Sequence, residues 1–307
     1  MIITWFILIV GFVLLVRGAD AFVDGAVGIA QRFHIPAIVI GTTLVAIGTS
    51  APEAAISITA ALKGSDGVSI GNVIGSNITN IFLILGTTAL IAKLTIQKNT
   101  KFFELPFVGF ITIIMCAMGI YSGEISRISG VILLGLFIVF LCYMTIVAYK
   151  SNYAPKELKI MPWSETIVVI IAGIAALVIG ANMITESATD IAHQIGVSDR
   201  IIGLTLVAFG TSLPELVVCV VAALKHEYDI AIGNIIGSNI FNILFVLGAT
   251  AVIQLIPFDA QFITDGGIAL LAVTMLMIFT ARNSKLGRIG GILFLAAYAG
   301  YIFYLMI

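Results

Sequence analysis

The chain consists mainly of apolar runs of about 20 residues, each long enough to cross a lipid bilayer as one helix. Of its 307 residues, 60% are hydrophobic and only 10% are charged, and the mean hydropathy is +1.17. A soluble domain carries about 25% charged residues and could not cover its surface with so few. The composition therefore excludes a soluble enzyme, a nucleic-acid binder and a disordered chain, and it predicts a multi-pass protein of the lipid bilayer.

Ten runs are predicted to be membrane-spanning helices, which makes the expected fold class all-α. The first and sixth runs are longer than a bilayer needs, so we expect these two helices to tilt or protrude. No soluble domain fits between the runs. They cover residues 2–31, 38–63, 68–93, 103–121, 127–149, 164–193, 200–225, 229–254, 262–281 and 286–306.

Basic residues in the loops predict the orientation of the chain, because Lys and Arg are enriched in cytoplasmic loops. If the chain has ten spans, eleven of the loop Lys and Arg residues fall on one side of the membrane. Three fall on the other side, namely Lys63, Arg127 and Arg200. The side with eleven includes the connector 150–161 and is expected to be cytoplasmic. Both termini are then extracellular, and the expected location is the cell membrane. Charges that serve only to solvate the loops are compatible with the same orientation.

The sequence contains two copies of one unit. Shifted by 162 residues, Gly18–Leu94 aligns with Gly180–Ile256 without a gap, and about 35 of the 77 positions are identical. The best-matched block pairs GTTLVAIGTSAPE, at 41–53, with GLTLVAFGTSLPE, at 203–215. The identity is far above what two apolar helices of similar composition would share.

Each copy holds five predicted spans, and because five is odd the second copy should enter the membrane from the opposite side. We expect one five-helix repeat over 1–149, a linker over 150–161 and a second repeat over 162–307, with the matched motifs at 41–81 and 203–243. Many secondary transporters have such inverted repeats and bind substrate at the midplane between them. A duplicated scaffold without a site is the alternative, but it should conserve apolar rather than polar positions.

Glu53 and Glu215 each sit in the middle of a long apolar run, near the expected centre of the membrane. A carboxylate there costs at least about 3 kcal/mol unless it is paired or lines a wet cavity. No Lys or Arg lies at that depth beside either motif, so the two carboxylates require a cation from solution. The alternative is that both glutamates are protonated and structural.

A proline precedes each glutamate and should break its helix. Pro52 and Pro214 donate no backbone hydrogen bond, and each clashes with the carbonyl four residues earlier. The freed carbonyls and the neighbouring hydroxyls should point into the gap, where such backbone is tolerated only if it lines a cavity. With the carboxylates they form an all-oxygen set, which suits Ca²⁺ or Na⁺ and argues against Zn²⁺ or Cu⁺. These residues are Ala46, Thr49, Ser50, Ala208, Thr211 and Ser212.

A second matched block adds neutral oxygen groups. It pairs IGNVIGSNITNI, at 70–81, with IGNIIGSNIFNI, at 232–243. Residues spaced four apart share a helix face, and an amide or hydroxyl oxygen can bind a cation without adding charge. The candidates are Ser76, Asn80, Ser238 and Asn242. Hydrogen bonding between helices is the alternative reading of this stripe, above all for Asn72, Asn77, Asn234 and Asn239.

These two motif pairs resemble the α-repeats of the cation/calcium exchanger superfamily, most closely a prokaryotic sodium/calcium exchanger, and the resemblance covers nearly the whole chain. It implies that Glu53 and Glu215 are the central Ca²⁺ ligands, shared with Na⁺, and that the other oxygen-bearing candidates complete the Ca²⁺ and Na⁺ sites. Some members, including K⁺-dependent exchangers, carry aspartate at the position of Asn242. Asparagine here argues against K⁺ dependence and leaves two carboxylates in the core.

The charge count bears on mechanism. Two carboxylates are neutralised by one Ca²⁺ or by two Na⁺, whereas three Na⁺ leave the site at +1. The resemblance implies exchange of three Na⁺ for one Ca²⁺ by alternating access, with the first and sixth helices sliding over the rest. Two bare carboxylates are too costly to cross the membrane empty, which gives a physical reason for obligatory exchange. We expect Na⁺ and Ca²⁺ as the transported ions, no cofactor, and a monomer as the functional unit.

Three other functions are alternatives to Na⁺/Ca²⁺ exchange. A Ca²⁺/H⁺ antiporter on the same fold would load two protons on the glutamates, although protons would not need the surrounding hydroxyls and carbonyls. A passive cation channel usually needs an open axis made by oligomer symmetry, whereas here both acidic motifs lie in one chain. An enzyme is disfavoured because no nucleophile–base pair or cofactor motif occurs.

Overall fold

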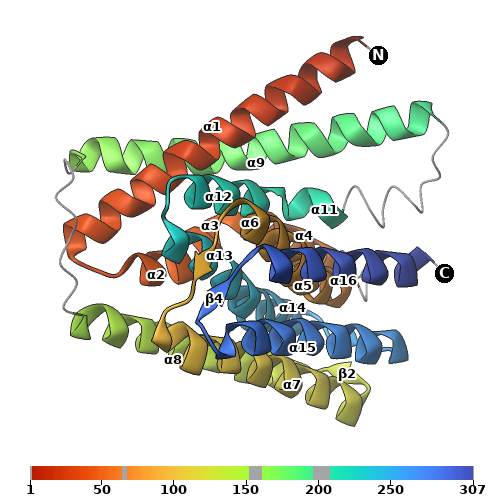
Figure 1. Cartoon of the computed structure of the whole chain (residues 1–307). Coiled ribbons are helices and arrows are strands. Elements are labelled where there is room, and N and C mark those ends of the chain that lie inside the picture. The colour runs from red at the N-terminus through yellow and green to blue at the C-terminus, as the bar shows by residue number, and fades with distance from the viewer. Residues whose placement is uncertain (1, 64–67, 152–160, 196–207, 307) are drawn as a thin grey trace.

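The computed structural model describes residues 2–63, 68–151, 161–195 and 208–306 as an almost wholly helical chain (Figure 1). Within these ranges eight helical segments are long and apolar enough to cross a membrane, and one bent pair of helices makes a ninth. The predicted run 200–225 lies partly outside the described residues, and its described part is α11 (Ala208–Thr211) and α12 (Leu213–Leu224). The predicted boundaries hold to within a few residues, except that the fourth span begins by Thr100 rather than at 103.

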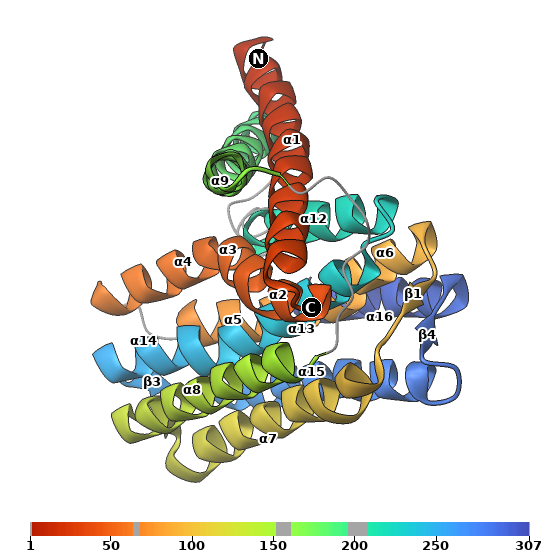
Figure 2. The same ribbon diagram turned by 90° about the vertical axis from the view of Figure 1, so that its left-hand side faces the viewer.

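Two long helices form a pair on one side of the molecule. These are α1 (Ile2–Phe33) and α9 (Trp163–Gln194), each of 32 residues, and both views show them lying outside the other helices (Figures 1 and 2). Their length matches the prediction that the first and sixth runs exceed the bilayer.

Glycines allow α1 and α9 to touch backbone to backbone. A Cβ built on Gly18 would lie 2.9 Å from the carbonyl oxygen of Gly173, and one on Gly180 would lie 2.8 Å from that of Gly11. Gly11 and Gly173 are 162 residues apart, and so are Gly18 and Gly180. The two contacts are therefore one contact repeated at the offset of the sequence repeat, and they use small residues as close helix packing in membranes does.

The remaining helices form a bundle beneath this pair (Figure 2). At its centre lies α13 (Tyr228–Phe241), in which every residue from Ile230 to Phe241 is buried. The helix continues through the π-helical η5 (Asn242–Leu247) into α14 (Gly248–Ile253). The equivalent helix of the first half runs through α5 (Val68–Thr79), the π-helical η2 (Asn80–Leu85) and α6 (Gly86–Ile91). The outer helices are η3 (Thr100–Glu104) with α7 (Leu105–Ser122), α8 (Arg127–Lys150), α15 (Ala260–Ala281) and α16 (Arg288–Met306).

The helices that carry the glutamates are broken where the prolines predict. The first runs through α2 (Ala37–Ile40), the π-helical η1 (Gly41–Val45) and α3 (Ala46–Thr49), and resumes at a bend of 48° as α4 (Ala51–Leu62). Ser50 stands in the break with φ −84° and ψ 10°. In the second half Ser212, with φ −89° and ψ 4°, separates α11 from α12 in the same way.

Two short ladders join the halves, and neither was predicted. In the first, β1 (Leu94–Thr95) pairs antiparallel with β4 (Lys285–Leu286). In the second, β2 (Glu124–Ile125) pairs antiparallel with β3 (Ile256–Pro257). Each ladder takes one strand from each half of the chain. The offset of 162 residues brings β1 onto β3 and Glu124 onto Leu286, so the two ladders are again one arrangement repeated.

Candidate cation-binding site

The helix breaks bring the two predicted glutamates together in the interior. Glu53 lies in the first turn of α4 and Glu215 in the first turn of α12, and each is 1% exposed. Pro52 and Pro214 are the second residues of these helices, where a backbone N–H would have no partner within the helix. Carboxylates in a first turn face the positive end of the helix dipole. Neither glutamate forms an ion pair with a described Lys or Arg, and Glu53 faces Glu215 and Thr211 across the site.

Hydroxyl groups of the first helix break reach across to the second half. Ser50 Oγ donates a hydrogen bond of 2.8 Å to Glu215 Oε1. Thr49 Oγ1 lies 2.9 Å from Asn234 Oδ1, and also 3.1 Å from the carbonyl oxygen of Val45. These contacts fix the break of one half against the carboxylate and amide of the other.

Buried oxygens without a partner mark the centre of the site. Among the described residues, nine buried side-chain oxygen atoms make no hydrogen bond, and six of the nine belong to residues that the motifs predict. An unpaired polar atom in a dry interior costs about 1–3 kcal/mol, so six in one place require a common partner. A desolvated cation is such a partner, because it binds several oxygen atoms at once through their lone pairs. The six atoms are Glu53 Oε2, Glu215 Oε2, Asn80 Oδ1, Asn242 Oδ1, Ser212 Oγ and Ser238 Oγ.

Both site asparagines stand where an α-helix widens into a π-helix. Asn80 is the first residue of η2 and Asn242 the first residue of η5, and each is 1% exposed. π-Helical turns are rare and occur mostly at functional sites, because they displace a side chain and loosen the local hydrogen-bond ladder. Nothing in the sequence pattern predicted them.

The other predicted residues lie around this centre in different states of pairing. The carbonyl of Ala46 accepts the Ser50 N–H at 3.0 Å and lies 3.3 Å from Thr49 Oγ1. Ser76 is buried on α5, and Thr211 is buried at the end of α11, next to the carboxylate of Glu53. Ala208 begins α11, and its side chain lies outside the described part of the structure.

The interhelical hydrogen bonds considered as the alternative for the asparagines are also present. Asn72 Nδ2 donates to Ser57 Oγ at 2.9 Å, and Asn234 Nδ2 donates to Cys219 Sγ at 3.3 Å. Ser57 and Cys219 are 162 residues apart, so this contact is repeated in both halves as well. The motifs gave no reason to select Ser57 or Cys219, since each looks like an ordinary helix residue.

Two carboxylates with buried oxygen atoms outside the site were missed in the sequence. Glu104 is 2% exposed and its Oε1 accepts a 2.9 Å hydrogen bond from Tyr143, while Asp265 is half-buried and its Oδ1 has no described partner. Each lies near the start of the fourth span of its half. A carboxylate inside the predicted runs 103–121 and 262–281 was the signal that could have found them.

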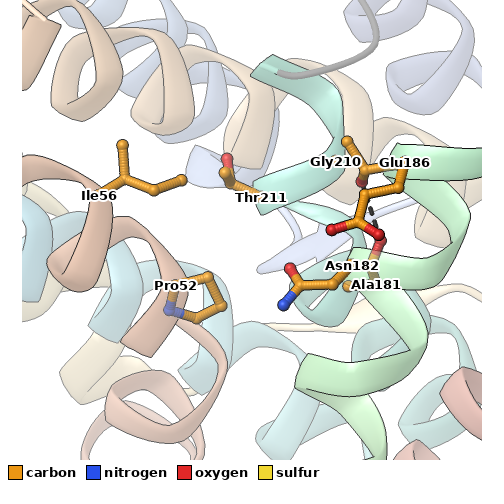
Figure 3. Close-up of a pocket in the computed structure, with 8 residues that line it drawn as sticks. Pro52, Ile56, Ala181, Asn182, Glu186, Gly210 and Thr211 are labelled. Carbon is orange, nitrogen blue, oxygen red and sulfur yellow. Dashed lines mark hydrogen bonds between the residues drawn. The ribbon is translucent and has the colours of Figure 1, made fainter. Parts of the chain in front are cut away.

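A cavity lies beside the site (Figure 3). It holds about 220 Å³ and is lined by residues of α4, α9 and α11. Pro52, which precedes Glu53, and Thr211, which lies beside the Glu53 carboxylate, are among its lining residues, together with Asn182 and Glu186 of α9. The cavity is lined by Pro52, Ile56, Ala181, Asn182, Thr185, Glu186, Gly210 and Thr211.

A cluster of charges closes the other end of α1 against α12. Lys225 Nζ lies 2.7 Å from Asp20 Oδ1 and 2.6 Å from Asp24 Oδ1. Desolvation lowers the pKa of Lys225, but the hydrogen bonds to Asp20 and Asp24 outweigh it and raise the pKa above its ordinary value. The counterparts at the 162-residue offset are Lys63 and, on the wall of the cavity, Asn182 and Glu186. Lys63 makes no ion pair with any residue in the described ranges.

The sodium/calcium exchanger protein family matches the chain twice, over residues 3–146 and 165–307. An uncharacterized membrane protein of Methanocaldococcus jannaschii is 38% identical over 292 residues, which cover 94% of each chain. The sodium/calcium exchanger MaX1 of Methanosarcina acetivorans is 31% identical over 347 aligned residues, covering 98% of this chain and 97% of the relative. A solved structure of the sodium-calcium exchanger NCX_Mj superposes with a TM-score of 0.87 at 36% identity and covers 99% of both chains.

Proposed function

The chain belongs to the sodium/calcium exchanger protein family, and from this membership we propose that it exchanges Na⁺ for Ca²⁺ across the cell membrane. The resemblance to prokaryotic exchangers predicted from the motifs is confirmed by the family match and by the similarity to solved exchanger structures. The protein is a multi-pass membrane antiporter of the cation/Ca²⁺ class and not an enzyme. The ions are its substrates, and it needs no cofactor.

The observation that carries the proposal is the set of six unpaired buried oxygens around Glu53 and Glu215. Two carboxylates and four neutral oxygens match the ligand number that Ca²⁺ takes, and the same oxygens suit Na⁺. The remaining candidates offer further carbonyl and hydroxyl oxygens for the additional ions. We propose as ligands Ala46, Thr49, Ser50, Glu53, Ser76, Asn80, Ala208, Thr211, Ser212, Glu215, Ser238 and Asn242.

The charge of the site gives a reason for strict exchange. One Ca²⁺ brings the two carboxylates to neutrality, and three Na⁺ bring them to +1, so a cycle of three Na⁺ for one Ca²⁺ moves one net charge. The empty site carries two negative charges into a barrier of low dielectric constant, which costs several kcal/mol for each ion. Only a loaded site can therefore change sides at a useful rate.

We propose that ten spans form two inverted repeats, 1–149 and 162–307, joined by a cytoplasmic linker at 150–161, with both termini extracellular. The support is the recurrence of single contacts at an offset of 162 residues. The glycine contacts between α1 and α9 come in such a pair, and so do the two β-ladders. Both acidic motifs lie in one chain and face each other, which makes a monomer the functional unit.

In this orientation two cavities lie beside α1 and α9, toward opposite sides of the membrane. The cavity beside Pro52 and Thr211 lies toward the extracellular end of α9, and a second cavity of about 310 Å³ lies beside Asp20 and Lys225 toward the cytoplasmic side, where Lys225 pairs with Asp20 and Asp24. Alternating access is then a joint movement of α1 and α9 over the bundle that exposes the site to one side at a time.

A Ca²⁺/H⁺ antiporter is the second candidate. One observation favours it, because Glu53 Oε2 and Glu215 Oε2 have no described partner and could each hold a proton. Two protons neutralise the site as one Ca²⁺ does, and the exchange would move no net charge. The hydroxyls and amide oxygens around the glutamates favour Na⁺, because a protonated carboxyl has no use for so many acceptors.

The test is ⁴⁵Ca²⁺ uptake into proteoliposomes loaded with Na⁺, compared with choline-loaded vesicles at the same pH. Uptake that requires internal Na⁺ and responds to membrane voltage is the expected result. Uptake that ignores Na⁺ and follows an imposed pH gradient would overturn Na⁺ coupling and establish the second candidate.

A further inference from the structure

Four buried amides cross between the two halves at the centre of the molecule. They are Asn77 and Asn80 on the α5–η2 helix, and Asn239 and Asn242 on the α13–η5 helix, and none is more than 4% exposed. Asn80 and Asn242 are proposed ion ligands, whereas Asn77 and Asn239 are not. The four are related in pairs by the offset of 162 residues.

Backbone carbonyls fix the polarity of the first two amides. Asn77 Nδ2 donates to the carbonyl oxygen of Asn239 at 3.3 Å, and Asn239 Nδ2 donates to the carbonyl oxygen of Asn77 at 3.5 Å. A carbonyl can only accept, so each of these side chains must turn its nitrogen toward the opposite backbone. The side-chain oxygens of Asn77 and Asn239 are thereby left facing the other two amides.

Those oxygens in turn fix the polarity of the two ligand amides. Asn242 Nδ2 donates to Asn77 Oδ1 at 3.3 Å, and Asn80 Nδ2 donates to Asn239 Oδ1 at 2.9 Å. The remaining atoms, Asn242 Oδ1 and Asn80 Oδ1, have no partner among the described residues and belong to the six unpaired oxygens of the site. If either ligand amide turned over, its oxygen would face another oxygen and its N–H would face the cation.

We propose that Asn77 and Asn239 are positioning residues that hold the amide oxygens of Asn242 and Asn80 toward the transported ions, each serving the ligand of the opposite half. The proposal rests on the proposed function, because it assumes that the six unpaired oxygens bind the cations. Neither positioning residue touches an ion. Each prevents the amide of a ligand asparagine from turning over, which would exchange its accepting oxygen for its donating nitrogen at the ion.

The same geometry selects asparagine over aspartate at the ligand positions. An ionised aspartate at 242 has no hydrogen to give Asn77 Oδ1, and Asn77 cannot turn over without pointing its own oxygen at the Asn239 carbonyl. The hydrogen bonds of Asn77 and Asn239 therefore disfavour a third ionised carboxylate in the core. This links the hydrogen bonds between the helices to the charge that the site carries.

The experiment is a double-mutant cycle on ion affinity. Asn77→Ala should raise the KM for Ca²⁺ about tenfold, the order expected for one buried hydrogen bond, with little change in kcat. In an Asn242→Ala background, where no amide is left to orient, Asn77→Ala should add almost nothing. Paired instead with Asn80→Ala, on its own helix, Asn77→Ala should keep its full effect.

Controls separate positioning from packing. Thr250→Val removes a buried hydroxyl that bonds only to the Val246 carbonyl of its own helix, and it should leave the KM unchanged. If Asn77→Ala does not fold, Asn77→Ser and the mirror cycle of Asn239 with Asn80 replace it. Equal, additive losses in both Asn77 cycles would overturn the proposal in favour of a purely structural role. A wild-type protein without Na⁺-dependent uptake would instead count against the proposed function.

Discussion

Ser50 Oγ donates a 2.8 Å hydrogen bond to Glu215 Oε1, which joins the helix break of one half to the carboxylate of the other. The reciprocal contact is weaker, since Ser212 also lies beside the carboxylate of Glu53 but its Oγ makes no hydrogen bond of comparable geometry in the described structure. The two halves carry the same residues here, so the difference belongs to the conformation and not to the sequence. In the opposite conformation the two serines should exchange these states.

This asymmetry predicts unequal effects of two matching substitutions. Ser50→Ala removes a hydrogen bond to a charged group, worth about 1.5–3 kcal/mol, and should lower the melting temperature of the ion-free protein. Ser212→Ala removes a hydroxyl whose contact with Glu53 is the weaker of the two in this conformation, and it should cost less. The measurement is thermal unfolding in detergent without Na⁺ or Ca²⁺, and equal shifts for the two variants would contradict it.

Neutralising either glutamate should abolish transport while leaving the fold intact. Glu53→Gln or Glu215→Gln halves the negative charge that compensates Ca²⁺ in the interior, and about 3 kcal/mol corresponds to more than a hundredfold loss in Ca²⁺ affinity. Because glutamine keeps an acceptor oxygen for the neighbouring hydroxyls and removes a buried charge that has no counter-charge among the described residues, the melting temperature without ions should change little. Glu165→Gln, on the exposed first turn of α9, is the matched control. Retained Na⁺-driven ⁴⁵Ca²⁺ uptake in both variants would remove the site.

Asn242→Asp should change the ion dependence of transport more than the stability of the protein. The substitution removes the N–H that Asn242 donates to Asn77 Oδ1 and adds a third acidic group to the two glutamates of the proposed site. A different number of charged ligands changes the affinity for a divalent cation and the charge moved per cycle. The Na⁺ and Ca²⁺ dependence of uptake and its voltage response, compared with the wild type, test this. Unchanged ion dependence would exclude residue 242 as a ligand.

The cluster of Lys225 with Asp20 and Asp24 should act as a latch for one conformation. Lys225→Met should destabilise the described conformation by about 0.5–1 kcal/mol for each partly exposed ion pair. Because the pKa of Lys225 is raised, the latch should persist at neutral and mildly basic pH. Lys63→Met should act in the opposite sense, since Glu186 is its expected partner once the cavity closes. The readout is labelling of a cysteine introduced at Asn182, and the exposed Lys98→Met is the control.

If the latch has no such role, Lys225→Met and Lys63→Met will label at the same rate as Lys98→Met. A common shift of both variants in one direction would also contradict the idea, since the two lysines should favour opposite states.

The features of this protein that depend on local chemistry could be predicted from its sequence. Pro52 and Pro214 predicted the helix breaks because a missing N–H acts where it stands, and the long apolar runs predicted α1 and α9 because their length is a local property. Ten of the twelve proposed ligands came from polar residues in apolar surroundings and two from backbone carbonyls next to the prolines, and six of the twelve carry the unpaired oxygens.

The rest depends on contacts that no local pattern encodes. The ladders are two residues long, too short for periodicity, and the π-helical turns at Asn80 and Asn242 follow from packing rather than propensity. That Asn77 faces the backbone of Asn239 can be seen only once the two helices are placed side by side. Glu104 was missed for a different reason, because it lies in a run whose matched motif is absent.

The ladders also bear on how such a chain could have arisen. Each has one strand from the first half and one from the second, so a single half holds a partner for neither of its own strands. An ancestor of half this length could have formed both ladders only by associating with a second copy of itself. Fusion of the two genes would have fixed that encounter in a single polypeptide. The two halves, produced today as separate chains, should still find each other.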